Sequence, residues 1–435
     1  MGFFSGKSFV PIEGRKDLSN TKPIKEFLNP NTVAIPLRTM DSEAFEALVS
    51  VGDKVKIGTK IGQRIDHFSV PLFSSISGTV IAIEKRDHAS LKKADHIVIE
   101  NDFKEEVEPL FEGGNLDSLS PEDVKARIKD LGVIGLGGAG FPTYIKFGNT
   151  ADVKTLLING VECEPYITAD EFNMKESADL LMQGLQILIK AADAQKAIIV
   201  IKEGKKELYD LLKSELKEKI ELTTVPDVYP AGWEKFIVNH VMKKDYEKIP
   251  VEIGCVVMNT STVIEFARSL NSGLPIHTRL ITISGEGIKE PCTVRVKVGT
   301  KLSEAIEAIG GYTEEVIKNP KASKLVAGGP LMGAPLTTDE VSINTASNGF
   351  LALPPVSRQE SPCSRCGACV VNCPKGLQPI QILKAHQNKD MALLEKLGAD
   401  QCISCGICSF VCPSFIELTE VTTKAKKAVI AQAKK

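Results

Sequence analysis

The stretch CSRCGACVVNCP at residues 363–374 has a second copy, CISCGICSFVCP, at residues 402–413. Both copies space their cysteines as Cys-x2-Cys-x2-Cys-x3-Cys-Pro, the run that bacterial proteins use for [4Fe–4S] clusters. In such a pair the first three cysteines of a run bind one cluster and the fourth binds the other. The rule predicts one ligand set of Cys363, Cys366, Cys369 and Cys412, and a second set of Cys402, Cys405, Cys408 and Cys373. Clusters with interleaved ligands must lie close together, so the region predicts a short electron relay.

Zinc and disulfide bonds are the alternatives for so many cysteines. Zinc sites use paired Cys-x2-Cys units, which would leave the third and fourth cysteine of each run without a role. Disulfides need an oxidising compartment, and residues 1–9, MGFFSGKSF, contain no apolar core of a signal peptide. Iron–sulfur clusters account for every cysteine of both runs. The other three, Cys163, Cys255 and Cys292, are expected to be small core residues.

Length and composition indicate an ordinary globular protein of several domains. With 435 residues, 43% of them hydrophobic and 25% charged, the chain is too long for one core. The net charge of -2 gives no support for binding nucleic acid. No apolar run approaches the roughly 20 residues that span a bilayer. Abundant unpaired cysteines indicate a reducing compartment.

Residues from about 30 to 100 are rich in short β runs separated by Gly-Asp turns. Residues 51–58, VGDKVKIG, and residues 77–81, SGTVI, resemble the two halves of a lipoyl or biotinyl barrel-sandwich. In that family a lysine at a hairpin tip carries the swinging cofactor, but residues 63–68 read QRIDHF and offer no lysine. We therefore expect a structural barrel without a swinging arm.

Beyond residue 118 the patterns change three times. Apolar β-branched runs at 155–158, 197–201 and 255–258 alternate with helical stretches, which predicts an α/β layer with a mostly parallel sheet. Residues 277–350 mix strand and helix signals and predict a small α+β module. The cluster region is helical between its two cysteine runs, and the basic tail from residue 419 is expected to form a solvated terminal helix.

Residues 135–143, GLGGAGFPT, contain the dinucleotide pattern G-x-G-x-x-G. A Rossmann loop needs a full strand before the pattern and a helix directly after it, and neither is evident here. The glycines still permit close backbone approach to a flat ring or a phosphate, with Lys146 as a possible counter-charge. A merely tight turn is the alternative.

A cluster of polar side chains follows the next strand. Asn159, Glu162 and Glu164 come directly after it, and ligands of open α/β sheets bind at carboxyl ends of strands. An asparagine can pair with a flavin's pyrimidine edge, and carboxylates can accept ribose hydroxyls. A solvated acidic turn is the competing interpretation.

These pieces, in this order, resemble the RnfC family, the peripheral C subunits of Rnf ion-translocating ferredoxin:NAD oxidoreductases. The resemblance rests on GLGGAGFPT, on NGVECEP at 159–165, on YPAGWEK at 229–235, on GGPLMG at 328–333 and on the twin cysteine runs. The central part is also similar to the flavin- and NADH-binding subunit of respiratory complex I, although Trp233 stands where that relative has a glutamate. The resemblance implies noncovalent FMN and a bound NADH at a site formed by Gly135, Gly137, Gly138, Lys146, Asn159, Glu162, Glu164, Glu234, Asn259 and Thr262.

The resemblance also implies an order of domains. They are an N-terminal extension (1–29), a barrel-sandwich (30–112), a Rossmann-like FMN/NADH-binding α/β domain (118–272), an SLBB-type module (275–350), a helical two-[4Fe–4S] ferredoxin domain (355–418) and a basic tail (419–435). The implied protein is a translocase subunit without protein catalytic groups. It passes electrons between two [4Fe–4S] clusters, FMN and NAD(H), and docks on the cytoplasmic side of the membrane. Its implied partners are the other Rnf subunits, both the integral membrane ones and the one that accepts electrons from ferredoxin.

Two other functions fit the same motifs. One is a cobalamin reductase like PduS of bacterial microcompartments, which combines a flavin with two clusters. The other is a relay or assembly module without its own nucleotide site.

Overall fold

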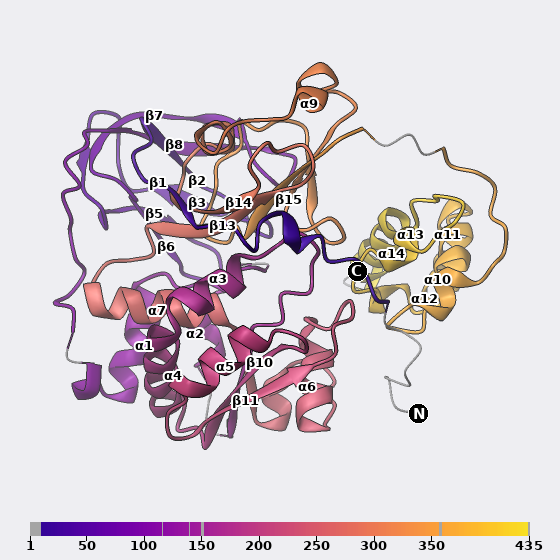
Figure 1. Cartoon of the computed structure of the whole chain (residues 1–435), viewed down its shortest axis with the longest axis horizontal. Coiled ribbons are helices and arrows are strands. Elements are labelled where there is room, and N and C mark those ends of the chain that lie inside the picture. Colours follow the sequence, from indigo (N-terminus) through magenta and orange to yellow (C-terminus); the bar gives the residue numbers. More distant parts are fainter. Residues whose placement is uncertain (1–9, 115, 139, 149–151, 356–358, 434–435) are drawn as a thin grey trace.

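The computed structural model describes residues 10–114, 116–138, 140–148, 152–355 and 359–433. Residues 1–9 of the predicted extension and 434–435 of the predicted tail lie outside the described residues. Figure 1 shows a β-rich region and an α/β region stacked on each other, with a small helical region to one side.

The N-terminal region is a sandwich of two antiparallel sheets. The first has the order β2-β8-β7-β4 and the second β3-β5-β6. Alternate residues such as Val33, Ile35, Ile97 and Ile99 are buried in a shared core, because successive side chains of a strand face opposite sides. The strands are β2 (Thr32–Pro36), β3 (Phe45–Ala47), β4 (Lys54–Val55), β5 (Lys60–Arg64), β6 (Pro71–Phe73), β7 (Gly78–Asp87) and β8 (Lys93–Asn101).

The α/β region contains a parallel sheet in the order β11-β10-β9-β12. Leu156 and Ile158 belong to the core beneath α4 and α7, whereas Leu157 belongs to the core beneath α6. Helices therefore cover both faces, as the continuous apolar strands predict. The strands are β9 (Thr155–Asn159), β10 (Lys196–Lys202), β11 (Ile220–Val225) and β12 (Cys255–Asn259). The helices are α1 (Pro121–Asp130), α2 (Thr143–Lys146), α3 (Ala169–Glu176), α4 (Ala178–Ala192), α5 (Lys206–Glu215), α6 (Glu234–Met242) and α7 (Thr260–Ser272).

The third region is a mixed sheet in the order β1-β14-β13-β17-β15-β16. Its edge strand β1 (Lys25–Phe27) comes from the N-terminal extension and pairs in parallel with β14. The other elements are β13 (Thr278–Ser284), β14 (Cys292–Lys297), β15 (Lys324–Ala327), β16 (Ala334–Leu336), β17 (Gly349–Leu353), α8 (Leu302–Ala308) and α9 (Glu314–Lys318). Short 3-10 helices occur elsewhere as η1 (Lys16–Leu18), η2 (Leu116–Ser118), η3 (Pro250–Ile253) and η4 (Ala399–Gln401).

The C-terminal region is a bundle of short helices around the cysteines. Its helices are α10 (Ala368–Val371), α11 (Pro379–Gln387), α12 (Met391–Lys396), α13 (Ile407–Phe410) and α14 (Leu418–Ala433). The expectation of a solvated terminal helix is wrong, because Ala425 and Val429 of α14 are buried in a core with Ile382 of α11. The tail therefore belongs to the cluster region.

Candidate functional site

The stretch with the G-x-G-x-x-G pattern, here called the glycine loop, contributes Gly135, Gly137 and Gly138 to a pocket of about 390 Å³. The carboxyl ends of β9 and β12 line the same pocket, here called the glycine-loop pocket, and its volume is typical of ligand sites. Thr262 lies behind the loop, where its Oγ1 accepts a hydrogen bond of 2.9 Å from the Leu136 main chain. The other residues predicted for FMN and NADH all line the pocket. They are Gly135, Gly137, Gly138, Lys146, Asn159, Glu162, Glu164, Glu234 and Asn259.

The glycine loop offers an open main-chain surface to this pocket. A Cβ added at Gly138 would meet no protein atom within 4 Å, and one at Gly135 would come no closer than 3.6 Å to any. Gly137 has φ +72°, a left-handed conformation that favours glycine. The loop therefore leaves room for a flat ring against its backbone, so the residues present fit a flavin.

Two asparagines at the strand ends are held by hydrogen bonds to main-chain groups and, for Asn259, to the Asp170 side chain. Asn159 donates to the Gly232 carbonyl at 3.0 Å and accepts from the Val161 amide at 3.1 Å. Asn259 caps α7 by accepting from the Ser261 amide at 2.8 Å. Its amide nitrogen donates to Asp170 at 2.7 Å. Both side chains are thus fixed before a ligand binds.

Lys146 and Glu234 lie in the pocket wall. The Lys146 ammonium donates to the Val257 carbonyl at 2.7 Å, and burial lowers the pKa of Lys146. Glu234 accepts a hydrogen bond of 3.1 Å from the Tyr246 hydroxyl. Sequence reasoning missed Tyr246, which carries no motif of its own. It also left Asp170 out of the site, although Asp170 lines the same pocket.

Glu162 is a buried carboxylate at the start of the turn after β9. Its Oε1 accepts from the Asp170 amide at 2.7 Å, and its Oε2 pairs with the Lys16 ammonium at 3.1 Å. Burial raises the pKa of Glu162 to about 7, and the Lys16 charge partly opposes that rise. Lys16 was not among the predicted site residues, because it lies in the N-terminal extension.

Glu164 ties three parts of the chain together. Its carboxylate accepts hydrogen bonds from the Leu331 and Met332 amides at 3.1 and 3.0 Å. It also accepts one from the Tyr229 hydroxyl at 3.2 Å. Burial raises the pKa of Glu164. The side chain predicted to face NADH thus also anchors the loop between β15 and β16.

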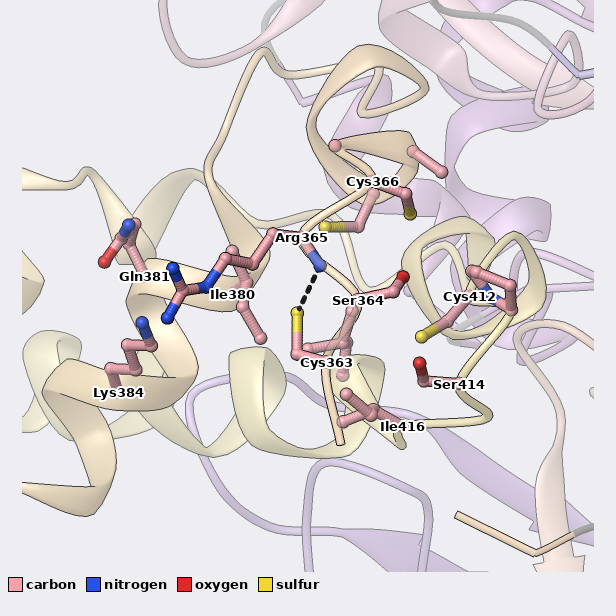
Figure 2. A pocket seen from close by; sticks show the side chains of 15 residues that line it. Cys363, Ser364, Arg365, Cys366, Ile380, Gln381, Lys384, Cys412, Ser414 and Ile416 are labelled. Atoms are coloured by element: carbon pink, nitrogen blue, oxygen red, sulfur yellow. Dashed lines mark hydrogen bonds between the residues drawn. The ribbon is translucent and has the colours of Figure 1, made fainter. Parts of the chain in front are cut away.

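The cysteines surround two separate cavities. Among the residues that the structure describes, no group of three or more His, Cys, Asp or Glu side chains converges closely enough for a single metal ion. Figure 2 shows the Cys363, Cys366 and Cys412 thiols around the first cavity, with Lys384 to one side. The first cavity is lined by Cys363, Cys366, Cys369 and Cys412, and the second by Cys373, Cys402, Cys405 and Cys408.

The two runs repeat one local geometry. The main-chain amides of Arg365 and Ser404, each two residues after the first cysteine of its run, donate to that cysteine's sulfur at 3.4 Å. Such N–H···S contacts stabilise sulfur that carries negative charge and tune the potential of a cluster. The donor set therefore fits iron–sulfur ligation.

The second cavity adjoins the glycine-loop pocket. Ile403 and Cys405 line both of them. The Tyr229 hydroxyl, already bonded to Glu164, donates to the Cys405 carbonyl at 2.8 Å. Cys405 is only 8% exposed, whereas Cys363 and Cys366 are exposed.

Comparison with protein families defines the class of the chain. Its segments match a Nuo51 FMN-binding domain (residues 128–268), an RnfC barrel sandwich hybrid domain (7–104), an SLBB domain (280–335) and a 4Fe-4S dicluster domain (362–416). These matches confirm the predicted fold class and the predicted FMN and [4Fe–4S] cofactors.

Individual relatives identify the family within this class. The chain is 32% identical to the C subunit of the Na(+)-translocating ferredoxin:NAD(+) oxidoreductase complex of Acetobacterium woodii, over 100% of this chain and 98% of that protein. It is 34% identical to the proton-translocating counterpart of Clostridium ljungdahlii, over 88% of this chain and 84% of the relative. The chain belongs to the RnfC family of C subunits of ion-translocating ferredoxin:NAD oxidoreductase complexes.

The fold also resembles a solved NAD+-reducing [NiFe]-hydrogenase, with a TM-score of 0.50 and 17% identity over 73% of this chain and 65% of the other. This likeness concerns the fold alone. Family membership supports the predicted electron-transfer subunit over the cobalamin reductase and the relay module without a nucleotide site.

Proposed function

We propose that this chain passes electrons between a redox partner and NAD(H) along a line of three centres. They are an outer cluster held by the first ligand set, an inner cluster held by the second set, and FMN in the glycine-loop pocket. The observation that carries this order is that Cys405 lines both the inner-cluster cavity and the glycine-loop pocket.

FMN is the cofactor that exchanges an electron pair with a nicotinamide and single electrons with a cluster. The chain's own residues bind and orient it. The Gly135–Gly138 backbone would lie against the ring, and Asn159 and Asn259 would supply fixed amide groups. Glu164 and Glu234 would accept hydrogen bonds from the nucleotide. No side chain is required as a nucleophile or general base.

The outer cluster is the entry point for the partner in this proposal. Cys363 and Cys366 are exposed, so a second protein can approach that cluster closely. Among the described helices, none combines the length and the apolar character needed to cross a bilayer. Because its relatives are subunits of ion-translocating complexes, we propose that the chain is a peripheral subunit on membrane-embedded Rnf subunits. It faces the cytoplasm, where NAD(H) is available, and receives electrons that originate from reduced ferredoxin.

The test is anaerobic purification of the full chain, with measurement of flavin, iron and response to NADH. We expect noncovalent FMN, about eight irons per chain for two [4Fe–4S] clusters, and bleaching of both flavin and cluster absorbance by NADH. A chain with both clusters but without FMN, or one that NADH leaves unchanged, would contradict the proposal.

A further inference from the structure

The N-terminal segment packs behind the glycine-loop pocket, where Lys16 contacts Glu162 and Ile167 of the pocket lining. Val10 and Tyr229 exchange main-chain hydrogen bonds of 3.0 and 3.2 Å. Further along, the Tyr166 amide donates to the Gly14 carbonyl at 2.7 Å. The Tyr166 contact holds the segment against the stretch that follows β9, about 150 residues away in sequence. The Val10 contact joins the segment to the residues just before α6.

Lys16 is the residue of this segment that contacts the pocket lining. Its ammonium donates to the main-chain carbonyl of Glu162 at 2.9 Å and to the Glu162 carboxylate at 3.1 Å. It also donates to the Ile167 carbonyl. The Lys16 and Glu162 side chains are only 10% and 7% exposed. A buried charge pair of this kind leaves a costly uncompensated charge when one partner is removed.

Glu162 adopts a backbone conformation that needs support. Its φ is +41°, in the left-handed region that non-glycine residues adopt uncommonly and that is enriched at functional sites. Lys16 contacts both the main chain and the side chain of this residue. It therefore fixes the turn and the direction of the carboxylate together.

Few other charges face the Glu162 carboxylate. Asp170 and Glu171 on α3 are the nearby acids, and both oppose its ionisation. Glu171 is itself paired with Lys175 and Lys205. Lys16 is thus the cation in direct contact with Glu162.

We propose that Lys16 is a positioning residue of the flavin site, which holds the Glu162 carboxylate against the pocket and favours its ionised form. The N-terminal segment is then part of the redox site. This inference rests on the proposed placement of FMN in the glycine-loop pocket.

The first test follows the protonation of Glu162 by infrared spectroscopy of the full, FMN-loaded chain. The carboxylic acid band is assigned by its loss in Glu162→Gln. In the parent chain it should titrate near pH 7, where burial places the pKa. Lys16→Met should move the midpoint upward by about one to three pH units, since a contacting opposite charge lowers a carboxyl pKa by that amount. Lys16→Arg should restore it.

The matched control is Lys25→Met, which removes the same charge from the same segment where Lys25 pairs with the exposed Glu290. It should leave the Glu162 midpoint in place. An unchanged midpoint in Lys16→Met, or an equal shift in Lys25→Met, would overturn the inference.

The second test is a double-mutant cycle on the reduction potential of bound FMN. Lys16→Met should shift that potential in the parent chain but not in the Glu162→Gln chain, because residues that act through one contact are not additive. Equal shifts in both backgrounds would overturn the inference. If Lys16→Met alone loses FMN, its recovery in the double variant supports the inference and continued loss contradicts it.

The two proposals fail differently. A parent chain that retains no FMN would contradict the proposed flavin site itself. A parent chain that retains FMN, with a Glu162 midpoint indifferent to Lys16, would contradict this inference alone.

Discussion

Gly138 occupies the open side of the glycine loop, where a side chain would meet solvent space and no protein atom within 4 Å. The protein itself gives no steric reason for a glycine here. A ligand lying on the loop gives one, since a methyl group would stand between the backbone and the ring. A substitution at Gly138 can therefore test flavin binding without disturbing the fold.

We expect Gly138→Ala to fold normally and to bind FMN at least tenfold more weakly, which corresponds to about 1.4 kcal/mol. Thermal unfolding and flavin content after gel filtration are the measurements. Gly148→Ala is the matched control, because a Cβ there makes only ordinary contacts of 3.4 Å. Full FMN retention by Gly138→Ala would remove the loop from the flavin site.

The crossed ligand sets are a second property of single residues. Cys373 lines the cavity of the second run, and Cys412 lines that of the first. We expect Cys373→Ser to lose the inner cluster and Cys412→Ser to lose the outer one, as electron paramagnetic resonance of the reduced chains can distinguish. Loss of only the outer cluster in Cys373→Ser would show that each run serves its own cluster.

At the scale of elements, the loop between β15 and β16 connects the third region to the glycine-loop pocket. Its Leu331 and Met332 amides bond to Glu164, which comes directly from the turn after β9. Gly329 makes this approach possible, because a Cβ there would lie 2.2 Å from the Glu164 carboxylate. The loop and the predicted NADH residue must therefore move together.

We expect Gly329→Ala to displace Glu164 at a cost of about 1–3 kcal/mol, the usual cost of overpacking. The KM for NADH should rise while FMN content stays unchanged, and calorimetry should show a lower melting temperature. Gly148→Ala, where a Cβ lies 3.4 Å from its nearest neighbour and outside the pocket, is the control. An unaltered KM would mean that Glu164 does not serve NADH.

Local patterns predicted most elements, and tertiary contacts account for the exceptions. The runs at 155–158, 197–201 and 255–258 form β9, β10 and β12, because apolar β-branched residues suit a strand buried on both faces. Strand β1, with the sequence KEF, has no such pattern and exists through its pairing with β14. The packing of α14 against α11 likewise depends on a tertiary contact, and no local sequence pattern predicts it.

Across the whole molecule, motifs located the site but long-range contacts completed it. The spacing of residues within the glycine loop, the strand-end carboxylates and the cysteine runs is enough to predict a ligand pocket and two clusters. Lys16, Asp170 and Tyr246 carry no such spacing, since folding brings them from separate elements into contact with Glu162, Asn259 and Glu234 of the pocket. The placement of the second cysteine run beside that pocket is also a tertiary property, and it sets the order of the proposed relay.

That order is tested most directly by electron paramagnetic resonance of the Cys366→Ser chain after addition of NADH. Cys366 belongs to the outer set alone, so the FMN pocket and the inner set remain intact. We predict that NADH still reduces the inner cluster although the outer one is missing. An inner cluster that stays oxidised, in a chain that retains FMN, would contradict it.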